Sequence, residues 1–330
     1  MFTSSYSQFK YWKTYIKRNR FSYDQIPDQT GKVVIVTGAN IGLGYATTVA
    51  LAGHGAHVFL ACRDQERATN AIERAKRDIK EKYPHAASPK LEFLELDLND
   101  MSKARQAAKD FLAKNLPLHL LICNSGILMV PFELSADGIE TQFAVNHMGH
   151  FVFTTTLLDR LRATEPSRVV IVSSIAHEAA RSGGIDFETL NVRTKGSNAF
   201  FRYARSKLAN VLFAKALARR LEQDRVYVNV AHPGYVHTGL LRHTRAAWGV
   251  AFNSIMETIT KIIALKPEAG CLTQLYLAIS PDIEEHDIRG RYFIPIGNEI
   301  KPSAYARDEI LQEKLWLFSE KLVREKIGEI

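Results

Sequence analysis

The chain has 330 residues, of which 46% are hydrophobic, and carries a formal net charge of +8. It is long enough for one large α/β core or two small ones. Three widely spaced cysteines give neither a disulfide framework nor a metal-ligand cluster, so no metal is expected and a reducing, cytoplasmic location fits. The dispersed basic residues predict no nucleic-acid partner. No apolar run reaches the roughly eighteen residues of a membrane span, and no signal peptide is visible.

Residues 1–30 read as a basic, aromatic extension ahead of the main domain. All charged residues before Asp24 are basic, and apolar residues recur at helical spacing: Phe2, Tyr6, Phe9, Trp12 and Ile16. Residues 1–22 could lie in a membrane interface, in peripheral contact with a membrane or lipid droplet. Packing on the domain's own surface and a targeting role are open alternatives.

The first strong element is a strand that runs into a glycine-rich loop. Lys32–Val36 is continuous and β-branched, as in a buried strand, and a helical pattern follows from Tyr45 to Gly53. Between them lies Gly-x-x-x-Gly-x-Gly, where the backbone can approach a ligand and the helix N-terminus can receive a pyrophosphate. We expect a dinucleotide to bind here, at Thr37, Gly38, Asn40, Ile41, Gly42 and Gly44.

Strand-like and helical segments then alternate along the chain. The further expected strands are His57–Ala61, Leu91–Leu96, His119–Cys123, Arg168–Ser173, Val226–Ala231 and Arg291–Ile294. Expected helices include Ala136–Arg162 and Phe200–Leu221. This alternation predicts an α/β fold: one doubly wound Rossmann-type domain over residues 31–300, with a mainly parallel sheet flanked by helices. Residues 301–330 are expected to form a helical tail.

Tyr203 and Lys207 stand four residues apart in the second of these helices. Residues i and i+4 share a helix face, so both side chains can reach the same ligand. A nearby cation favours the phenolate form of a tyrosine, which suits a general acid for a carbonyl oxygen. Alone, the pair would be an ordinary surface pair, but the upstream glycine loop favours a catalytic role.

Taken together, these motifs resemble the short-chain dehydrogenase/reductase family, most closely its branch of retinol dehydrogenases and WW-domain oxidoreductases. The resemblance covers about residues 28–300, and the motifs occur in the family's order. After the glycine loop come Asp97, Cys123–Gly126, Asn146, Ser173–Ser174, Tyr203 with Lys207, and His232–Thr238. Three positions depart from the common pattern: Ile41 replaces a frequent serine or threonine, Cys123 an asparagine, and Ser125 an alanine.

The resemblance implies catalytic roles for four residues. Tyr203 would exchange a proton with the substrate oxygen, and Ser174 would hydrogen-bond the same oxygen. Lys207 would hold the nicotinamide ribose and stabilise the phenolate, while Asn146 would position a water in a proton relay. Ser173 is expected to make only local hydrogen bonds, and Asn146 could instead satisfy backbone groups in a kinked helix.

The resemblance also implies cofactor contacts beyond the glycine loop. Asp97 would bond the adenine, although it could instead cap the next helix, and Thr238 would bond the nicotinamide carboxamide. The other expected contacts are Leu98, Asn124, Ser125, Gly126, Tyr203, Lys207, Pro233, Gly234 and Val236.

The end of the second strand indicates which nicotinamide cofactor is used. A carboxylate there would bond the 2′-hydroxyl of NAD and repel the 2′-phosphate of NADP. The strand instead ends in Cys62-Arg63, and the arginine can pair with a phosphate bidentately. Asp64 follows, but is expected to open the next helix as a first-turn acid. NADP(H) is therefore favoured over NAD(H).

Two segments are expected to rim the substrate site. One is the loop between Ser174 and Tyr203, which contains Gly183-Gly184 and Arg193–Gly196. The other, residues 235–266, is apolar and amphipathic, with three open interpretations: a substrate lid, a membrane-facing patch or an ordinary buried helix. An apolar lid would suit a lipophilic carbonyl or alcohol.

The sequence thus predicts an NADP(H)-dependent oxidoreductase acting on a lipophilic ketone, aldehyde or alcohol, in the reductive direction, with Tyr203 as general acid/base. One alternative is oxidation of a retinol- or steroid-like alcohol with NAD(P)⁺. Another is a non-catalytic scaffold that senses nucleotide. Since the family often assembles through the helix that carries the active site, a homodimer or tetramer is also expected.

Overall fold

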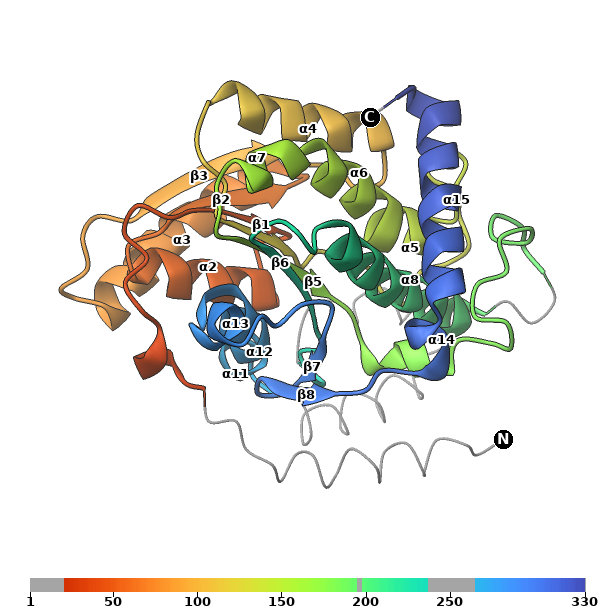
Figure 1. Ribbon diagram of the computed structural model, residues 1–330. Helices are drawn as coiled ribbons and strands as arrows, with labels where there is room; N and C mark the ends of the chain where they lie inside the picture. Colours follow the sequence, from red (N-terminus) through yellow and green to blue (C-terminus); the bar gives the residue numbers. More distant parts are fainter. Residues whose placement is uncertain (1–20, 195–197, 237–264, 330) are drawn as a thin grey trace, which may run out of the picture.

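The structure is a computed structural model that describes residues 21–194, 198–236 and 265–329 (Figure 1). Three sets of expectations fall outside these ranges. They concern the aromatic positions of residues 1–20, the loop positions 195–197, and most of the expected lid with Thr238, at residues 237–264.

An eight-stranded sheet in the order β3-β2-β1-β4-β5-β6-β7-β8 forms the centre of the molecule. Its strands are β1 (Val33–Thr37), β2 (His57–Cys62), β3 (Lys90–Glu95), β4 (Leu120–Cys123), β5 (Ser167–Val172), β6 (Val226–Ala231), β7 (Tyr292–Ile294) and β8 (Asn298–Ile300). The first seven run parallel, and β8 pairs antiparallel with β7. The strand order reverses between β1 and β4, which is where ligands bind in such sheets.

Helices cover both faces of the sheet (Figure 1). One face carries α4 (Met101–Ala113), α5 (Thr141–Phe143), α6 (Gly149–Thr156), α7 (Leu158–Arg162), α8 (Ala199–Arg220), α14 (Ala304–Arg307) and α15 (Glu309–Ile327). The other carries α2 (Gly42–Gly53), α3 (Gln65–Lys82), α11 (Pro267–Gly270), α12 (Leu272–Ile279) and α13 (Asp282–Glu285). The described residues also form three short helical turns: η1 (Tyr23–Gln25), η2 (Ala144–Met148) and η3 (Ile175–Ala179).

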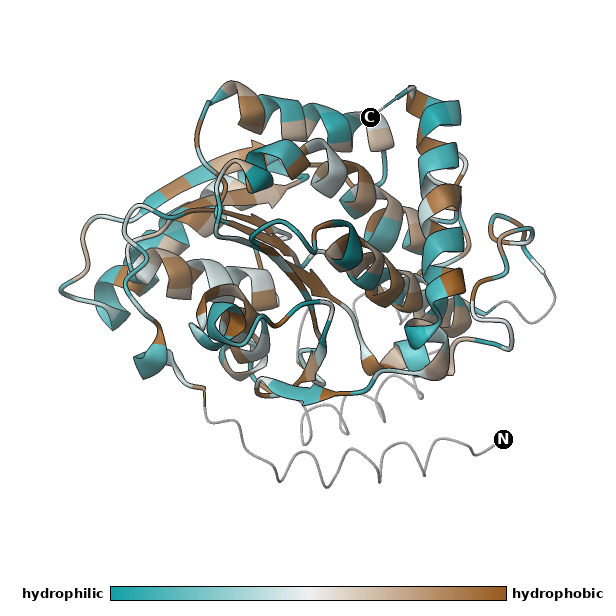
Figure 2. Ribbon diagram, viewed as in Figure 1, coloured by the Kyte–Doolittle hydropathy of each residue, from teal (hydrophilic) through white to brown (hydrophobic). Residues whose placement is uncertain are grey.

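Side chains alternate between the two faces of each strand, and this divides the core into two layers. Val33 and Ile35 of β1 pack in the cluster beneath α4, α6 and α8, whereas Val34 and Val36 pack beneath α2 and α12. Both faces of the central strands are therefore buried, which explains their continuous apolar sequence. Figure 2 shows these strands in the colours of hydrophobic residues and the outer helix faces as largely hydrophilic.

The predicted fold class is confirmed, and every predicted strand is present within one residue of its expected bounds. The sequence did not predict β8, because a three-residue edge strand is too short to show an alternating pattern. The predicted helices at Tyr45–Gly53 and Phe200–Leu221 correspond to α2 and α8.

The predicted helix Ala136–Arg162 is wrong at its start and in its continuity. Gly138 has φ +76°, and residues 134 and 140 pair across a turn. The helix begins only at α5, where the Glu140 carboxylate accepts hydrogen bonds from the N–H groups of Gln142 and Phe143. It then widens into the π-helical turn η2, which contains Asn146. Such turns are frequent at functional sites.

Both ends of the described chain contribute to the core. Phe21 and Ile26 are buried beside the α2 layer. In α15, an apolar stripe packs against α8: Leu311, Leu315, Trp316 and Val323. Among the helices within the described ranges, none combines the length and apolarity needed to cross a bilayer.

Candidate active site

A cleft of about 710 Å³ lies at the carboxyl ends of β1 to β4. Seven of the predicted cofactor residues line it: Gly38, Asn40, Ile41, Arg63, Asp97, Leu98 and Ser125. The sequence analysis missed several other lining residues, among them Arg67, Ile127, Val130 and Pro131. Arg67 lies in the first turn of α3, close in sequence to Arg63 at the end of β2, so its position after the second strand was the available signal.

The glycine loop approaches this cleft in conformations that favour glycine. Gly38 and Gly42 have φ of +64° and +59°. A Cβ on Gly44 would lie 2.4 Å from the carbonyl oxygen of Gly38, so no side chain fits there. The N-cap residue of α2 is Ile41, which has no side-chain oxygen to bond the first turn. The N–H groups of that turn are thus suited to an anion such as a pyrophosphate.

Thr37 and Asn124 hold the loop in place. The Asn124 side chain donates to the Thr37 carbonyl at 2.8 Å, and the Ser125 N–H donates to the Thr37 hydroxyl at 2.9 Å. Thr37 is fully buried, and its hydroxyl also bonds Nε2 of His150 at 2.9 Å. These two predicted cofactor residues therefore shape the loop rather than line the cleft.

Ser174 and Tyr203 meet at the ends of η3 and α8. The Ser174 side chain is hydrogen-bonded to the Tyr203 hydroxyl and also accepts from the Ala176 N–H at 3.2 Å. Burial raises the pKa of Tyr203 to about 12, and the hydrogen bond from Ser174 opposes this shift. The lower pKa expected from a nearby cation is not found, so the phenol is a proton donor at neutral pH.

Lys207 lies one turn beyond Tyr203 and is only 4% exposed. Its Nζ donates to the Val172 carbonyl at 3.1 Å and lies 5.8 Å from the centre of the Tyr203 ring. Burial lowers the pKa of Lys207 to about 8. The expectation of purely local bonding by Ser173 is wrong, because its hydroxyl donates to the Lys207 carbonyl at 2.7 Å.

The side chain of Asn146 is hydrogen-bonded to the chain segment that follows β4. It accepts from the Ile127 N–H at 2.8 Å and donates to the Ile127 carbonyl at 3.0 Å and to the Ser206 hydroxyl at 2.8 Å. The backbone-binding alternative therefore describes this side chain, and the water relay stays a prediction. Gly126 lies against both groups: a Cβ there would be 3.1 Å from Asn146 Oδ1 and 3.3 Å from Lys207 Nζ.

Two carboxylates do not play the helix roles considered for them, although Asp97 does line the cleft as expected. Asp97 accepts from the N–H of Asn99 at 3.0 Å, and Asp100 is the residue that caps α4. The capping alternative for Asp97 is therefore wrong. Asp64 is the N-cap of α3, where it accepts from the Arg67 N–H at 2.9 Å, and not an acid of the first turn.

The chain after β6 bends away at residues that do not line this cleft. Gly234 has φ +85° and lies against Pro295, while Pro233 precedes it in the bend. Val236 pairs with Leu265 in an isolated bridge, so the two described edges of the expected lid lie together.

Part of the loop that was expected to rim the substrate site is buried in the core. Ile185 and Leu190 are buried in the same cluster as α8. The Gly183 N–H donates to the Tyr305 hydroxyl at 3.0 Å, which ties the loop to α14.

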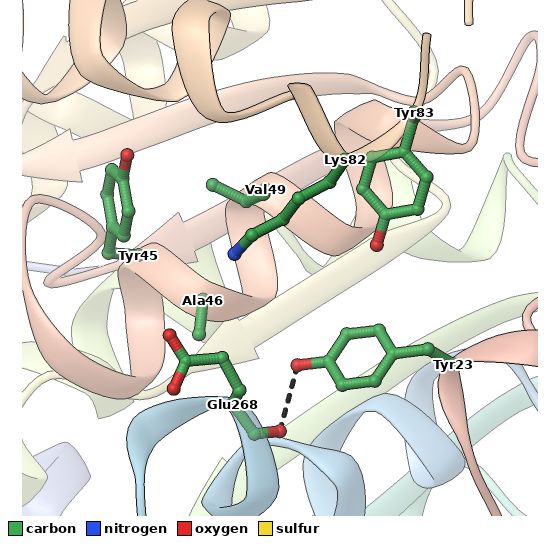
Figure 3. Close-up of a pocket in the computed structure, with 7 residues that line it drawn as sticks. All are labelled: Tyr23, Tyr45, Ala46, Val49, Lys82, Tyr83 and Glu268. Carbon is green, nitrogen blue, oxygen red and sulfur yellow. Dashed lines mark hydrogen bonds between the residues drawn. The ribbon is translucent and has the colours of Figure 1, made fainter. Parts of the chain in front are cut away.

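A second hollow, of about 240 Å³, lies apart from these groups beside α2 (Figure 3). It is lined by three tyrosines and four other residues: Tyr23, Tyr45, Tyr83, Ala46, Val49, Lys82 and Glu268. None of them is a predicted site residue. The Tyr23 hydroxyl closes one side by donating to the Glu268 carbonyl at 2.8 Å.

A family model described as short chain dehydrogenase matches residues 32–189 and 190–248. The chain belongs to the short-chain dehydrogenase/reductase family. The retinol dehydrogenase 14 of Homo sapiens is 39% identical over 300 residues, which cover 89% of this chain and 86% of that protein. The WW domain-containing oxidoreductase of Homo sapiens is 38% identical, over 91% of this chain and 70% of that one.

A solved structure supports the same conclusion. An uncharacterised protein from Mycobacterium paratuberculosis is 32% identical, with a TM-score of 0.71, and the similarity covers 94% of this chain and 99% of that one. The predicted resemblance to the retinol dehydrogenase and WW-domain oxidoreductase branch is confirmed. This short-chain dehydrogenase/reductase is therefore an NAD(P)-dependent oxidoreductase.

Proposed function

We propose that this short-chain dehydrogenase/reductase uses NADP(H) to reduce a lipophilic ketone or aldehyde, with Tyr203 as the general acid. The observation that carries the proposal is the hydrogen-bonded pair of Ser174 and Tyr203, with the buried ammonium of Lys207 one helical turn away. Gly126 and Ile127 connect this group to the cleft, since Gly126 lies against Lys207 and Ile127 lines the cleft.

Each residue has a distinct task in the proposed reaction. NADPH, when bound, would supply the hydride for the carbonyl carbon. Tyr203 gives its phenolic proton to the carbonyl oxygen, a step that typically contributes about 10²- to 10⁴-fold to the rate. Ser174 donates a second hydrogen bond to that oxygen, which stabilises the negative charge as it develops. Lys207 would hold the nicotinamide ribose.

Arg63 and Arg67 support the choice of NADP(H). Both line the cleft where β2 ends, and Cys62 stands where a carboxylate would repel a 2′-phosphate. The nearest acid, Asp64, already accepts from the Arg67 N–H and pairs with Arg67 Nε at 3.2 Å. A guanidinium presents paired donors to a phosphate, so Arg63 would bind the group that distinguishes the two cofactors.

A lipophilic substrate is supported by one wall of the cleft and by a relative. Ile127, Val130 and Pro131 give this wall an apolar surface. The name of the 39% identical human relative, retinol dehydrogenase 14, indicates a lipophilic alcohol as that protein's substrate. An apolar wall suits such a molecule, because the affinity of small-molecule sites comes mainly from apolar contact.

The deciding experiment follows NADPH consumption across a panel of aliphatic, aromatic and steroid-like carbonyls, with the Tyr203→Phe variant beside the wild type. We expect turnover in the wild type and a loss of at least about 100-fold in the variant. The affinity for NADPH should stay within about threefold, because only a hydroxyl is removed. Turnover retained by the phenylalanine variant would exclude Tyr203 as the acid.

The same assay separates the alternatives. Turnover confined to alcohols with NADP⁺ or NAD⁺ would indicate a dehydrogenase working in the oxidative direction. Tight nucleotide binding without turnover in either panel would indicate the non-catalytic scaffold.

A further inference from the structure

We infer that His177 is a positioning residue for Ser174. It links Ser174 to the C-terminal segment, residues 303–328, and this link sustains the rate of reduction. The inference rests on the proposed function, in which Ser174 acts on the substrate oxygen. The C-terminal segment lies outside the part of the chain that the family model matches, which ends at residue 248.

His177 bridges two main-chain groups that are far apart in sequence. The side chain is fully buried in η3, three residues after Ser174. Its Nδ1 lies 2.8 Å from the Ser174 carbonyl oxygen, and the N–H of Ser303 points to its Nε2 at 3.2 Å. The sequence separation between His177 and Ser303 is 126 residues, so the link depends on the complete fold.

These partners leave one protonation state for the ring. A carbonyl oxygen only accepts and a main-chain N–H only donates, so Nδ1 of His177 must carry the proton and Nε2 the lone pair. Burial lowers the pKa of His177 to about 4, in keeping with a neutral ring. Both ring nitrogens are satisfied, and the tautomer is fixed by contacts on opposite sides.

The bridge acts directly on the conformation of Ser174. The Ser174 carbonyl accepts from both the N–H of His177, at 3.1 Å, and its ring. The Ser174 hydroxyl meanwhile accepts from Ala176 and bonds Tyr203. With the carbonyl held by two donors, the peptide that follows Ser174 is held in one orientation, and with it the Cα that carries the hydroxyl side chain.

The C-terminal segment is itself held firmly against the site. The Tyr305 hydroxyl of α14 accepts from Gly183, and Ser319 of α15 bonds Nε2 of His147 at 2.9 Å, next to Asn146. Glu313 of α15 pairs with Arg220 of α8, with both carboxylate oxygens at 2.8 Å from one guanidinium nitrogen. Figure 1 shows α14 and α15 beside α8, which carries Tyr203. The segment therefore reaches each element that bears a candidate catalytic residue.

Two substitutions at Ser303 isolate the link from the capping of α14. The Ser303 hydroxyl caps the Ala306 N–H, and both Ser303→Ala and Ser303→Pro remove this cap. Only proline also removes the N–H that bonds His177, and φ at this position, −52°, lies within the range that proline adopts. Proline also places its Cδ where that hydrogen was, against the ring, so the difference between the two variants measures the loss of the link together with a displacement of the ring.

We expect Ser303→Pro to lower kcat by roughly tenfold or more relative to Ser303→Ala, since small misplacements of catalytic groups cost up to about 100-fold. NADPH affinity should be equal in the two variants. At His177 itself, asparagine keeps a donor in the place of Nδ1, whereas leucine keeps none. His177→Asn should therefore retain several-fold more kcat than His177→Leu, a rescue that a merely space-filling histidine would not show.

A measurement independent of turnover separates this inference from the proposed function. In ¹⁵N-histidine-labelled protein, the His177 ring, assigned by its loss in His177→Asn, should show the neutral Nδ1–H tautomer. Its Nε2 resonance should shift in Ser303→Pro and stay in place in Ser303→Ala. An Nε2–H tautomer, or equal kcat in the two Ser303 variants, would overturn the inference. An inactive wild type with the expected tautomer would instead overturn the proposed function and leave the link standing.

Discussion

The hydroxyl of Ser173 donates a 2.7 Å hydrogen bond to the main-chain carbonyl of Lys207, 34 residues later. This bond joins the carboxyl end of β5 to the middle of α8. Ser174 directly follows Ser173, and Tyr203 lies one turn before Lys207, so the bond sets the spacing between the two hydroxyls that meet in the site. The first serine of the pair builds the site, and the second faces the substrate in the proposed reaction.

The choice of cofactor can be tested at Arg63. Replacement by leucine should weaken NADPH binding by roughly ten- to 100-fold, because a hydrogen bond to a charged group contributes about 1.5–3 kcal/mol. NADH binding should change little, and fluorescence titration measures both. Arg77→Leu, at an exposed arginine of α3 outside the cleft, is the matched control. An equal loss for both cofactors would assign Arg63 to a group that they share.

NADPH affinity should depend on pH through Lys207. The free protein holds this ammonium at a pKa of about 8, and hydrogen bonds to ribose hydroxyls favour its charged form. Binding then raises the pKa, so affinity is full below pH 8 and falls as the pH rises above it, by at most about tenfold per unit. Lys207→Arg cannot deprotonate and should bind with a flat profile from pH 8 to 10. A flat wild-type profile would contradict the role.

Four buried histidines should make the fold sensitive to acid. Burial lowers the pKa values of His147 and His232 to about 3 and those of His150 and His177 to about 4. The unfolded chain binds these protons below pH 6.5 and the folded one does not. Stability is therefore full above pH 6.5 and falls below it, by up to about 1.4 kcal/mol per pH unit for each histidine.

Urea unfolding at pH 7 and pH 5 measures this loss directly. His85→Asn, which removes an exposed histidine, should leave the slope unchanged. Equal free energies of unfolding at the two pH values would contradict the expected linkage.

The ion pair between Arg202 and Glu140 should be important for stability. Glu140 is fully buried, with one carboxylate oxygen 3.1 Å from Arg202 Nε, and Arg202 also donates to the Val130 carbonyl at 2.9 Å. Arg202→Met leaves a buried carboxylate short of its main partner, so the free energy of unfolding should fall by about 3 kcal/mol or more. Arg162→Ala removes an exposed pairing with Asp224 and should cost less than about 1 kcal/mol. Equal losses in urea unfolding would mean that the buried carboxylate is satisfied without Arg202.

The features that depend only on neighbouring residues could be predicted from the sequence. The strand bounds, the glycine loop and the Tyr203–Lys207 pair each depend on a few neighbouring residues, and all of them predicted the fold correctly. The π-helical turn at Asn146 could not be predicted, because nothing in its composition separates it from an α-helix. The capping of α4 by Asp100 rather than Asp97 was missed because both acids precede the same helix.

Features that depend on distant partners could not be predicted. The tautomer of His177 depends on Ser303, and the place of Thr37 depends on Asn124 and His150. For His150, the signal in the sequence was its four-residue spacing from Asn146, which puts the two side chains on one helix face. Reductive direction, substrate class, membrane contact and a homodimer or tetramer stay predictions.

Gly126 has no side chain, and the positions of two groups in the site depend on this. Its bare backbone is the surface against which Asn146 Oδ1 and Lys207 Nζ rest, at 3.1 and 3.3 Å from the position that a Cβ would take. One added methyl group would push the ammonium and the amide outward together. The ammonium donates to the main-chain carbonyl of Val172 and the amide to that of Ile127, so moving either group would strain these hydrogen bonds. Alanine at this position would therefore displace the ammonium and the amide from the positions that the proposed reaction requires.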